Sequence, residues 1–342
     1  MQQNLSTVER SLQSEPEVGA PVVPPRDPRL LRQEVHQLSE EQRMAQGGAY
    51  TCFLATAQQI PNILYEIGRL RELTFRAAGE GTGMMIDLDE FDTRYLHLFL
   101  WDAKEDEVVG AYRLGPTDTL VPRFGPQGLY TSTLFDYDPE LFDRLDPALE
   151  LGRSFVRPEY QKTYSALLLL WKGIGRFVVK NPRYARLFGA VSISRVYNEL
   201  SRQLLVAFLR VNSYLPELAR FVIAKNPLPT RPTSSWASKV ASLVGKDLEE
   251  VTALLSYIEE GQREIPILLR QYLKLGGKLL GFNQDPLFSG VWDGLILVGL
   301  TQTDLRVLER YMGKQGMRDF LAYQHLPLLG QTSLSLGEPL RG

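Results

Sequence analysis

The chain has 342 residues, which is enough for one large domain or two ordinary ones. Its net charge of −2 excludes the basic surface of a general nucleic-acid binder, so we expect no nucleic-acid partner. The single cysteine, Cys52, cannot form an internal disulfide, which fits a reducing compartment. No signal peptide is recognisable, and no apolar run approaches the ~20 residues that cross a bilayer. We expect a cytoplasmic protein, with peripheral contact at the inner face of the membrane left open.

The first part of the chain combines a proline-rich start with two regular elements. Residues 1–48 have little apolar periodicity, so we expect a largely disordered tail with at most a short helix near residues 30–46. Residues 50–55 predict a strand, and Pro61 begins a predicted helix that ends near Gly79. Residues 79–83 lack the Gly-Lys-Ser/Thr ending of a phosphate-binding P-loop. We therefore expect a flexible connection there.

The middle of the chain predicts a hairpin, an irregular stretch and a strand–helix pair. Residues 96–101 and 107–114 are rich in aromatic and branched side chains around a polar turn, which is typical of a β-hairpin. Prolines and glycines recur through residues 115–147 and predict an irregular segment. Residues 148–156 predict the next strand, which ends at a proline because proline cannot donate to a sheet. An apolar helix is predicted over residues 163–180.

The remaining elements decide the fold class. Strands are predicted at residues 186–194, 278–282 and 294–300, and helices at 197–211, 239–261, 267–275 and 303–311. Hairpins and crossovers alternate, which is typical of an α+β protein with a mixed sheet. We expect one domain over residues 49–315, a largely helical insert at about 199–275 before the last two strands, and a C-terminal tail at 316–342.

The predicted strand at residues 148–156 is the first candidate site. Regular alternation puts Glu150, Gly152, Ser154 and Val156 on one face and Arg153 on the other. Two small residues beside a carboxylate leave room for a bound chain, and the following helix start offers unpaired N–H groups that suit phosphate. The alternative is a plain core strand with a charged rim.

An acidic run, Asp87 to Asp92, is the second candidate. It can form a cation-binding rim for an amine, a metal site or a solvated loop, although its spacing does not fit a calcium loop. Arg69, Arg71 and Arg76 on the preceding helix can pair with this run or with Glu150. A buried ion-pair network of this kind is more often structural than catalytic unless it lies in a cleft.

Six segments together resemble a known group. They are residues 67–76, 87–92, 108–114, 150–160, 265–278 and 293–298. Their order and spacing resemble the GNAT-like acyltransferases, a group that includes proteins labelled hemolysins and the ornithine- and glycine-lipid N-acyltransferases. More distantly, they are similar to acyl-homoserine-lactone synthases. The resemblance covers about residues 50–315 and implies a GNAT-like mixed β-sheet that is splayed at residues 148–156.

The resemblance also implies a donor site. The acyl-thioester arm would pair with backbone near Phe155 and Val156, and residues 161–166 would form the phosphate loop. The implied donor-binding residues are Phe155, Val156, Arg157, Gln161, Lys162, Thr163, Tyr164, Ser165 and Ala166. Tyr164 replaces a glycine of the family loop, which favours an acyl carrier protein (ACP) as donor. Acyl-ACP or acyl-CoA would be a co-substrate, and no permanently bound cofactor or metal is expected.

The implied chemistry is attack of an amine on a thioester carbonyl. Glu150 is the candidate base, which requires a raised pKa. Arg153 and Arg69 would organise the carboxylates, and Ser192 or Ser194 would assist the thioester. Arg153 needs a bulge or twist to reach the face of Glu150. The implied acceptor-binding residues are Arg69, Arg71, Phe75, Asp87, Asp89, Asp92 and Arg113.

The function implied is transfer of a fatty acyl group from an ACP or CoA thioester to the amine of an amino acid, as in amine-containing lipid synthesis. An acyl-homoserine-lactone-type synthase that uses S-adenosylmethionine is one alternative, and a non-catalytic module that binds ACP or acyl chains is another. Cations that suit an acidic carrier protein follow the strand at 148–156: Lys172, Arg176, Lys180 and Arg183. The insert would cover the acyl chain or rest on a membrane surface.

Overall fold

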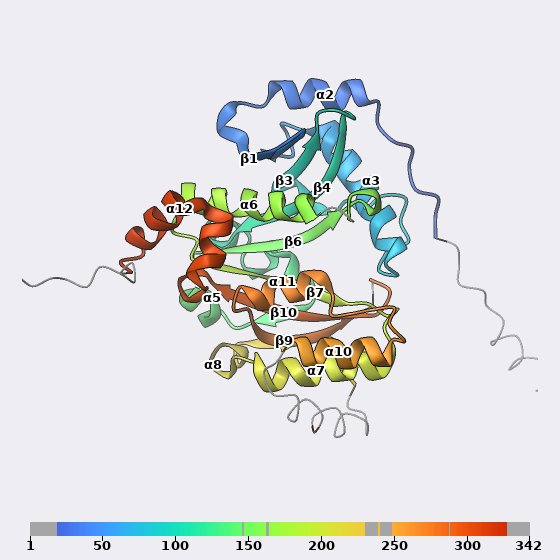
Figure 1. The fold of residues 1–342 in the computed structure, drawn as a ribbon, viewed down its shortest axis with the longest axis vertical. Coiled ribbons are helices and arrows are strands. Elements are labelled where there is room, and N and C mark those ends of the chain that lie inside the picture. Colours follow the sequence, from blue (N-terminus) through green and yellow to red (C-terminus); the bar gives the residue numbers. More distant parts are fainter. Residues whose placement is uncertain are drawn as a thin grey trace, which may run out of the picture.

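The computed structural model describes residues 19–145, 147–161, 164–229, 239, 248–286 and 288–326, and a single eight-stranded sheet organises them (Figure 1). All neighbouring strands run antiparallel except β6 and β7, so the mixed α+β class is confirmed. In sheet order the strands are β1 (Arg43–Gly47), β2 (Tyr50–Thr56), β3 (Leu96–Asp102), β4 (Glu107–Pro116), β6 (Ala148–Val156), β7 (Arg186–Ile193), β10 (Val291–Gly299) and β9 (Lys278–Asp285).

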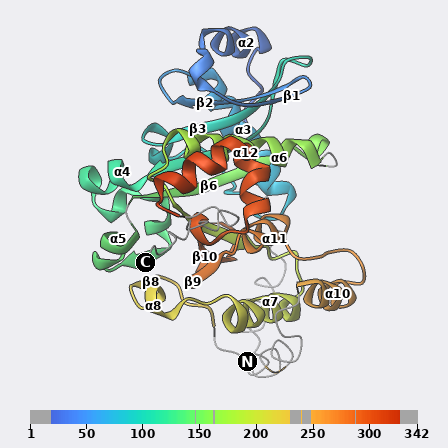
Figure 2. The ribbon, with the colours of Figure 1, turned by 60° about the vertical axis from the view of Figure 1, so that its left-hand side comes forward.

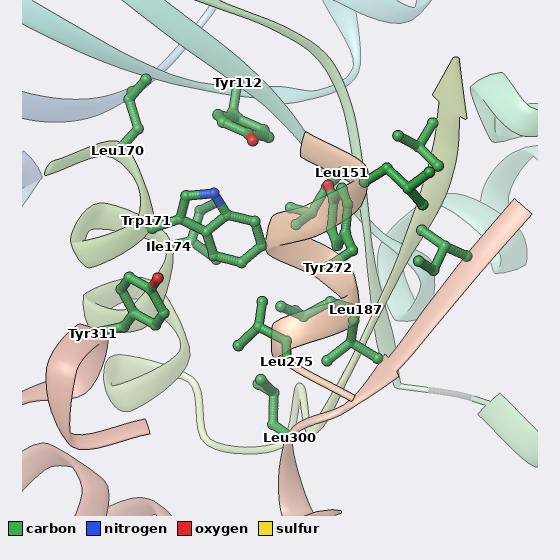
Figure 3. Close-up of a cluster of buried hydrophobic side chains, with 14 of the residues drawn as sticks. Tyr112, Leu151, Leu170, Trp171, Ile174, Leu187, Tyr272, Leu275, Leu300 and Tyr311 are labelled. Carbon is green, nitrogen blue, oxygen red and sulfur yellow. The ribbon is translucent and has the colours of Figure 1, made fainter. Parts of the chain in front are cut away.

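One face of the sheet carries the largest core. Helices α6 (Tyr164–Lys180), α11 (Ile267–Lys274) and α12 (Leu305–Tyr323) cover it, and α7 (Glu199–Asn212) and α10 (Leu248–Ile258) extend it beyond β9. Figure 3 shows Tyr112, Trp171, Tyr272 and Tyr311 meeting at its centre. The rings of Trp171 and Tyr272 pack edge to face at 5.4 Å, a contact worth about 1 kcal/mol beyond the buried area. This packing ties α6 and α11 to the sheet.

The opposite face has two parts. Helix α3 (Pro61–Ala77) covers β2 to β6, and α2 (Pro28–Gln37) packs on it (Figure 2). The second part was expected to be irregular over residues 115–147, and that prediction is wrong. It contains α4 (Thr117–Phe124), β5 (Phe135–Tyr137) and α5 (Glu140–Leu145), and β5 pairs with β8 (Val222–Ala224) next to α8 (Pro216–Ala219). Apolar side chains such as Leu134 and Leu141 bury against the sheet and outweigh the turn-forming residues between them.

Both predicted tails are partly ordered. Asp27 caps α2 and Pro28 occupies its first turn, while the Glu34 carboxylate accepts the N–H groups of Asn62 and Ile63 at the start of α3. Residues 43–47 then join the sheet edge as β1. The last helix continues to Tyr323 because its apolar residues after 316 bury in the main core. The short helix expected near residues 30–46 is present as α2, whereas the strand at residues 43–47 was not expected, and residues 316–323 belong to a helix.

The parallel ladder between β6 and β7 is short. Ala148 to Glu150 pair with Arg186 to Phe188, and the pairing ends there. Gly189 follows at a point of very close approach, because a Cβ built on it would lie 2.1 Å from the Leu151 carbonyl oxygen. Beyond Leu151 the two strands are separate, so the expected splay at residues 148–156 is present.

A β-bulge interrupts β6 where it pairs with β4. Gly152 lies opposite Arg113 and Phe155 opposite Ala111, so two residues of β6 face Tyr112 alone. Arg153, one of the two, has a left-handed backbone with φ 48°. The expected alternation is therefore wrong beyond Gly152. The bulge that Arg153 needs to reach the face of Glu150 is confirmed.

We expect Gly189→Ala to lower the free energy of unfolding by about 2–3 kcal/mol, because its methyl group would collide with the Leu151 carbonyl and force β6 and β7 apart. Urea denaturation followed by circular dichroism measures this. Gly299→Ala on β10 is the control, since its Cβ would meet only the Gln302 side chain at 3.6 Å. Equal stability of the two variants would contradict the close approach.

Candidate active site

A cavity of about 210 Å³ lies where β6 and β7 separate, and we call it the polar cavity because four charged side chains line it among apolar ones: Glu80, Arg153, Asp285 and Asp293. On the face of the sheet that α6 covers, the cavity is lined by Leu151, Ser154 and Val191. On the opposite face it is lined by Arg153 and Asp293. The cavity therefore passes through the gap between the strands. Its polar wall consists of Glu80, Tyr130, Arg153, Ser154, Ser192, Asp285 and Asp293.

A larger cavity of about 480 Å³ adjoins it and is mostly apolar. Its wall is built from α3, β4, β6, α6 and the start of α11: Thr74, Phe75, Ala78, Glu80, Tyr112, Ser154, Phe155, Val156, Tyr160, Gln161, Leu167, Ile267 and Leu268. Five residues belong to both walls: Phe75, Glu80, Ser154, Ile267 and Leu268. The two cavities therefore meet at these residues, and the charged side chains other than Glu80 lie in the smaller cavity.

Glu150, the predicted base, is a fully buried carboxylate beneath this site. It accepts hydrogen bonds from the Tyr95 hydroxyl, from Tyr130 N at 3.1 Å and from Thr131 N at 2.7 Å. It is not among the residues that line the two cavities. Burial raises its pKa, and the hydrogen bonds from Tyr95 and Thr131 oppose that shift. These contacts favour a structural role, in which Glu150 holds the segment that carries Tyr130.

Arg153 joins the polar cavity to a buried ion-pair network. Its Nη1 donates to the Tyr130 hydroxyl at 3.0 Å, its Nε lies 3.3 Å from Asp87 and its Nη2 lies 3.7 Å from Asp89. The ring of Phe288 lies under the guanidinium, 5.0 Å from its centre. The bulge in β6 thus places the positive charge of Arg153 at the cavity wall, and Asp87 and Asp89 balance that charge.

The remaining predicted acceptor residues form the rest of that network. Arg113 pairs with Asp89 at 2.6 Å and with Asp92 at 3.4 Å, and Arg71 pairs with Asp92 at 2.7 Å. Charge from Arg71 and Arg113 outweighs burial and lowers the pKa of Asp92 below its usual range. Arg69 instead pairs with Glu66 on its own helix, at 2.5 Å. Apart from Arg153, these charges do not line either cavity, whereas Phe75 lines both.

The predicted donor residues divide into three groups. Phe155, Val156 and Gln161 line the apolar cavity, and Gln161 Nε2 donates to the Val156 carbonyl at 2.7 Å. Arg157 turns away and pairs with Glu107. Tyr164, Ser165 and Ala166 begin α6, and Ala166 is buried in the main core. Lys162 and Thr163, with the side chain of Tyr164, lie outside the described residues.

The two predicted serines lie close to carboxylates. Ser192 lines the polar cavity and its hydroxyl donates to Asp293 at 2.9 Å. Ser194 donates to the Ala78 carbonyl at 2.7 Å, beside Glu80. Ser192 therefore lines the polar cavity directly, whereas Ser194 lines neither cavity.

Three acidic wall residues and Tyr130 were missed from the sequence. Burial raises the pKa of Asp293 to about 8, with Asp285 and Glu80 adding to the shift, and burial raises the pKa of Glu80 to about 7. The acids come from β9, β10 and the turn after α3, so no local motif joins them. Two features of the sequence could have pointed to these acids. Asp293 is an aspartate inside an apolar strand, and Glu80 directly follows the glycine that ends α3.

Comparison with known proteins identifies the family of the chain. The family model for the acetyltransferase (GNAT) domain matches residues 70–172. Glycine N(alpha)-acyltransferase of Bacteroides thetaiotaomicron is 33% identical over 275 residues, which cover 77% of this chain and 80% of the relative. L-ornithine N(alpha)-acyltransferase of Rhodobacter capsulatus is 31% identical over 61% of this chain and 75% of that protein. A solved CoA-dependent acyl-homoserine lactone synthase aligns with TM-score 0.36 and 12% identity over 80% of this chain and 89% of its own.

The site and the matched domain define a GNAT-type acyltransferase. The chain belongs to the family of GNAT N-acyltransferases that contains these relatives. The resemblance noted from the sequence segments is thereby confirmed.

We expect Glu150→Gln to lower the free energy of unfolding by about 2 kcal/mol, because an amide would turn its NH₂ group towards backbone N–H donors. Glu105→Gln in the exposed hairpin turn is the control and should change stability little. Urea denaturation compares the two variants. If Glu150→Gln is as stable as the wild-type protein, Glu150 does not have the structural role described above.

Asp293→Asn should stabilise the protein in a pH-dependent way. The folded-state pKa of about 8 lies above the ordinary 3.8, so the wild-type protein loses stability as pH rises between these values, because the unfolded chain ionises first. Asparagine stays neutral. We expect the variant to be more stable than wild type at about pH 8, by on the order of 2 kcal/mol, and the difference to shrink towards pH 5. Thermal melts at both pH values test this, and a pH-independent difference would contradict it.

Proposed function

We propose that the enzyme transfers a fatty acyl group from a thioester to the α-amine of an amino acid, forming an amide. The observation that carries the proposal is the junction of a polar and an apolar cavity at the gap between β6 and β7. An acyl chain and a charged acceptor need opposite environments, and they must meet at one carbonyl carbon. The relatives that act on glycine and on ornithine support an amino acid as the acceptor.

The apolar cavity suits the acyl chain. Its wall is dominated by Phe75, Phe155, Leu167 and Leu268, and each buried methylene of a chain would contribute about 0.8 kcal/mol. The edge of β6 that faces β7 has no strand partner beyond Glu150 among the described residues. That edge leads past Phe155 and Val156, so it can pair with the amides of a pantetheine arm, as we expect for the donor.

The polar cavity suits a zwitterionic acceptor. Arg153 can face the acceptor carboxylate, and Asp285 can face its ammonium group, with Asp293 on the neighbouring strand as a further hydrogen-bonding group. Tyr130, held by Arg153, forms the wall between them. Opposite charges at the two ends of a cavity of about 210 Å³ orient a small amino acid with its nitrogen fixed.

An acyl carrier protein remains our proposed donor, with acyl-CoA as the alternative. Lys172, Arg176 and Lys180 are exposed along α6, and they can contact an acidic carrier. Arg183 is already paired with Asp118. Because a helix rises about 1.5 Å per residue, Lys172 lies nearest the cavity and is the first cation to test. The product would be a single-chain amphiphile, which fits a step in amine-containing lipid synthesis at the membrane surface.

The test is direct product detection. Purified protein is incubated with a long-chain acyl-ACP or acyl-CoA and separately with glycine, ornithine, other amino acids or S-adenosylmethionine, and products are identified by mass. We expect an N-acyl amino acid with at least one acceptor. Carrier binding without product would support a binding module, and an acyl-homoserine lactone from S-adenosylmethionine would support the synthase alternative. Either result would overturn the proposal.

A further inference from the structure

An amine that attacks a thioester needs a base beside its nitrogen atom. The acceptor enters as an ammonium ion, so its proton must leave before its nitrogen can attack. The receiving group must reach the point where the acceptor cavity meets the acyl cavity. Five described residues line both cavities, and Glu80 is the one ionisable side chain among them. Resting on the proposed function, we propose that Glu80 is the general base that deprotonates the acceptor amine.

The backbone holds Glu80 firmly at this junction. Gly79 N donates to the Arg76 carbonyl at 3.0 Å and Glu80 N donates to the Phe75 carbonyl at 2.8 Å, which is the Schellman arrangement at the end of α3. Gly79 has φ 72°, a left-handed conformation that glycine adopts without strain. The direction of the Glu80 side chain is therefore determined by the helix end and not by a free loop.

The residue type at this position is unusual. The residue after the left-handed glycine of a Schellman motif commonly makes an apolar contact with the helix residue five positions earlier, here Phe75. Glu80 instead brings a carboxylate beside Phe75 into a largely apolar wall. A departure from a local folding rule without a structural gain is typical of a functional position.

The turn that follows is also anchored, so the expectation of a flexible connection over residues 79–83 is wrong. The buried Glu72 carboxylate accepts Thr82 Oγ1 at 2.6 Å and Gly83 N at 2.9 Å. Ser289 Oγ donates to the Gly81 carbonyl at 3.1 Å. A base held from both sides keeps its distance to the amine constant during the reaction.

Neighbouring groups tune Glu80 for proton transfer near neutral pH. Burial raises its pKa to about 7, and hydrogen bonding with Ser194 opposes the shift. Arg153, Asp285 and Asp293 line the polar cavity with it, and Tyr197 is close enough to feel its charge. Tyr130 and Tyr272 also line the polar cavity, and Tyr112 and Tyr160 line the apolar one. Asp293 lines only the polar cavity, and Glu150 lines neither, so neither carboxylate lies where the two cavities meet.

The step balances with the groups named. Glu80 takes one proton from the acceptor ammonium, and the free nitrogen forms a bond to the thioester carbonyl carbon. The carbon–sulfur bond then breaks, and the leaving sulfur takes the second amine proton to become a thiol. Glu80 returns its proton to solvent, so amide, thiol and one proton are produced.

The test is the pH dependence of amide formation in Glu80→Gln. With an amino acid acceptor we expect kcat to fall by on the order of 100-fold, and we expect the rise of activity around pH 7 to disappear. Hydroxylamine is already unprotonated at neutral pH and needs no base, so with this acceptor the loss should be less than about tenfold. Glu217→Gln on exposed α8 is the matched control and should behave like wild type.

A second variant covers the case in which Glu80→Gln does not fold. Glu80→Asp keeps a carboxylate but shortens the side chain by one methylene, so kcat with an amino acid should fall while the rise of activity around pH 7 remains. An unchanged pH profile in Glu80→Gln, a loss of that rise in Glu80→Asp, or an equal loss with hydroxylamine and amino acid would overturn the assignment of Glu80. A wild-type enzyme that acylates no amino acid would instead contradict the proposed function, and this inference with it.

Discussion

The short parallel ladder between β6 and β7 is the constraint on which the site depends. Parallel strands normally pair along their length, but here the ladder stops at Glu150 and Gly189 draws the strands together at the last point of contact. Past that point the start of α11 borders the opening, and its Ile267 and Leu268 line both cavities. The opening is therefore part of the packing between the sheet and α11.

The bulge in β6 is the second half of the same constraint. It costs one regular pair with β4 but moves Arg153 onto the face of Glu150, where Asp87 and Asp89 balance its charge. The charged groups near the site therefore fall into two sets. Arg71 and Arg113 pair with Asp92, and Glu150 accepts hydrogen bonds from Tyr95 and the Tyr130–Thr131 backbone, away from both cavities. At the cavity wall, burial raises the pKa values of Glu80 and Asp293.

Because of this division, the clusters of charge in the sequence did not identify the acidic residues that line the cavities. Asp92 is buried and paired with Arg71 and Arg113, which lower its pKa, and no residue of the acidic run 87–92 lines either cavity. Glu80 and Asp293 line the polar cavity, where burial raises their pKa values. A buried carboxylate with a raised pKa lowers the stability of the folded protein at neutral pH.

The amino-acid sequence by itself determined the α+β class, the hairpin of β3 and β4, the strand at 148–156 and the family, because alternation, helix periodicity and ordered motifs are local properties. It also required a bulge for Arg153. Only the tertiary structure decided which carboxylates line the cavities. Glu80, Asp285 and Asp293 come from three distant segments, and Glu150 is withdrawn from the cavity by the Tyr130–Thr131 backbone. Burial and pairing depend on long-range contacts, and these have no signature in the residues next to each carboxylate.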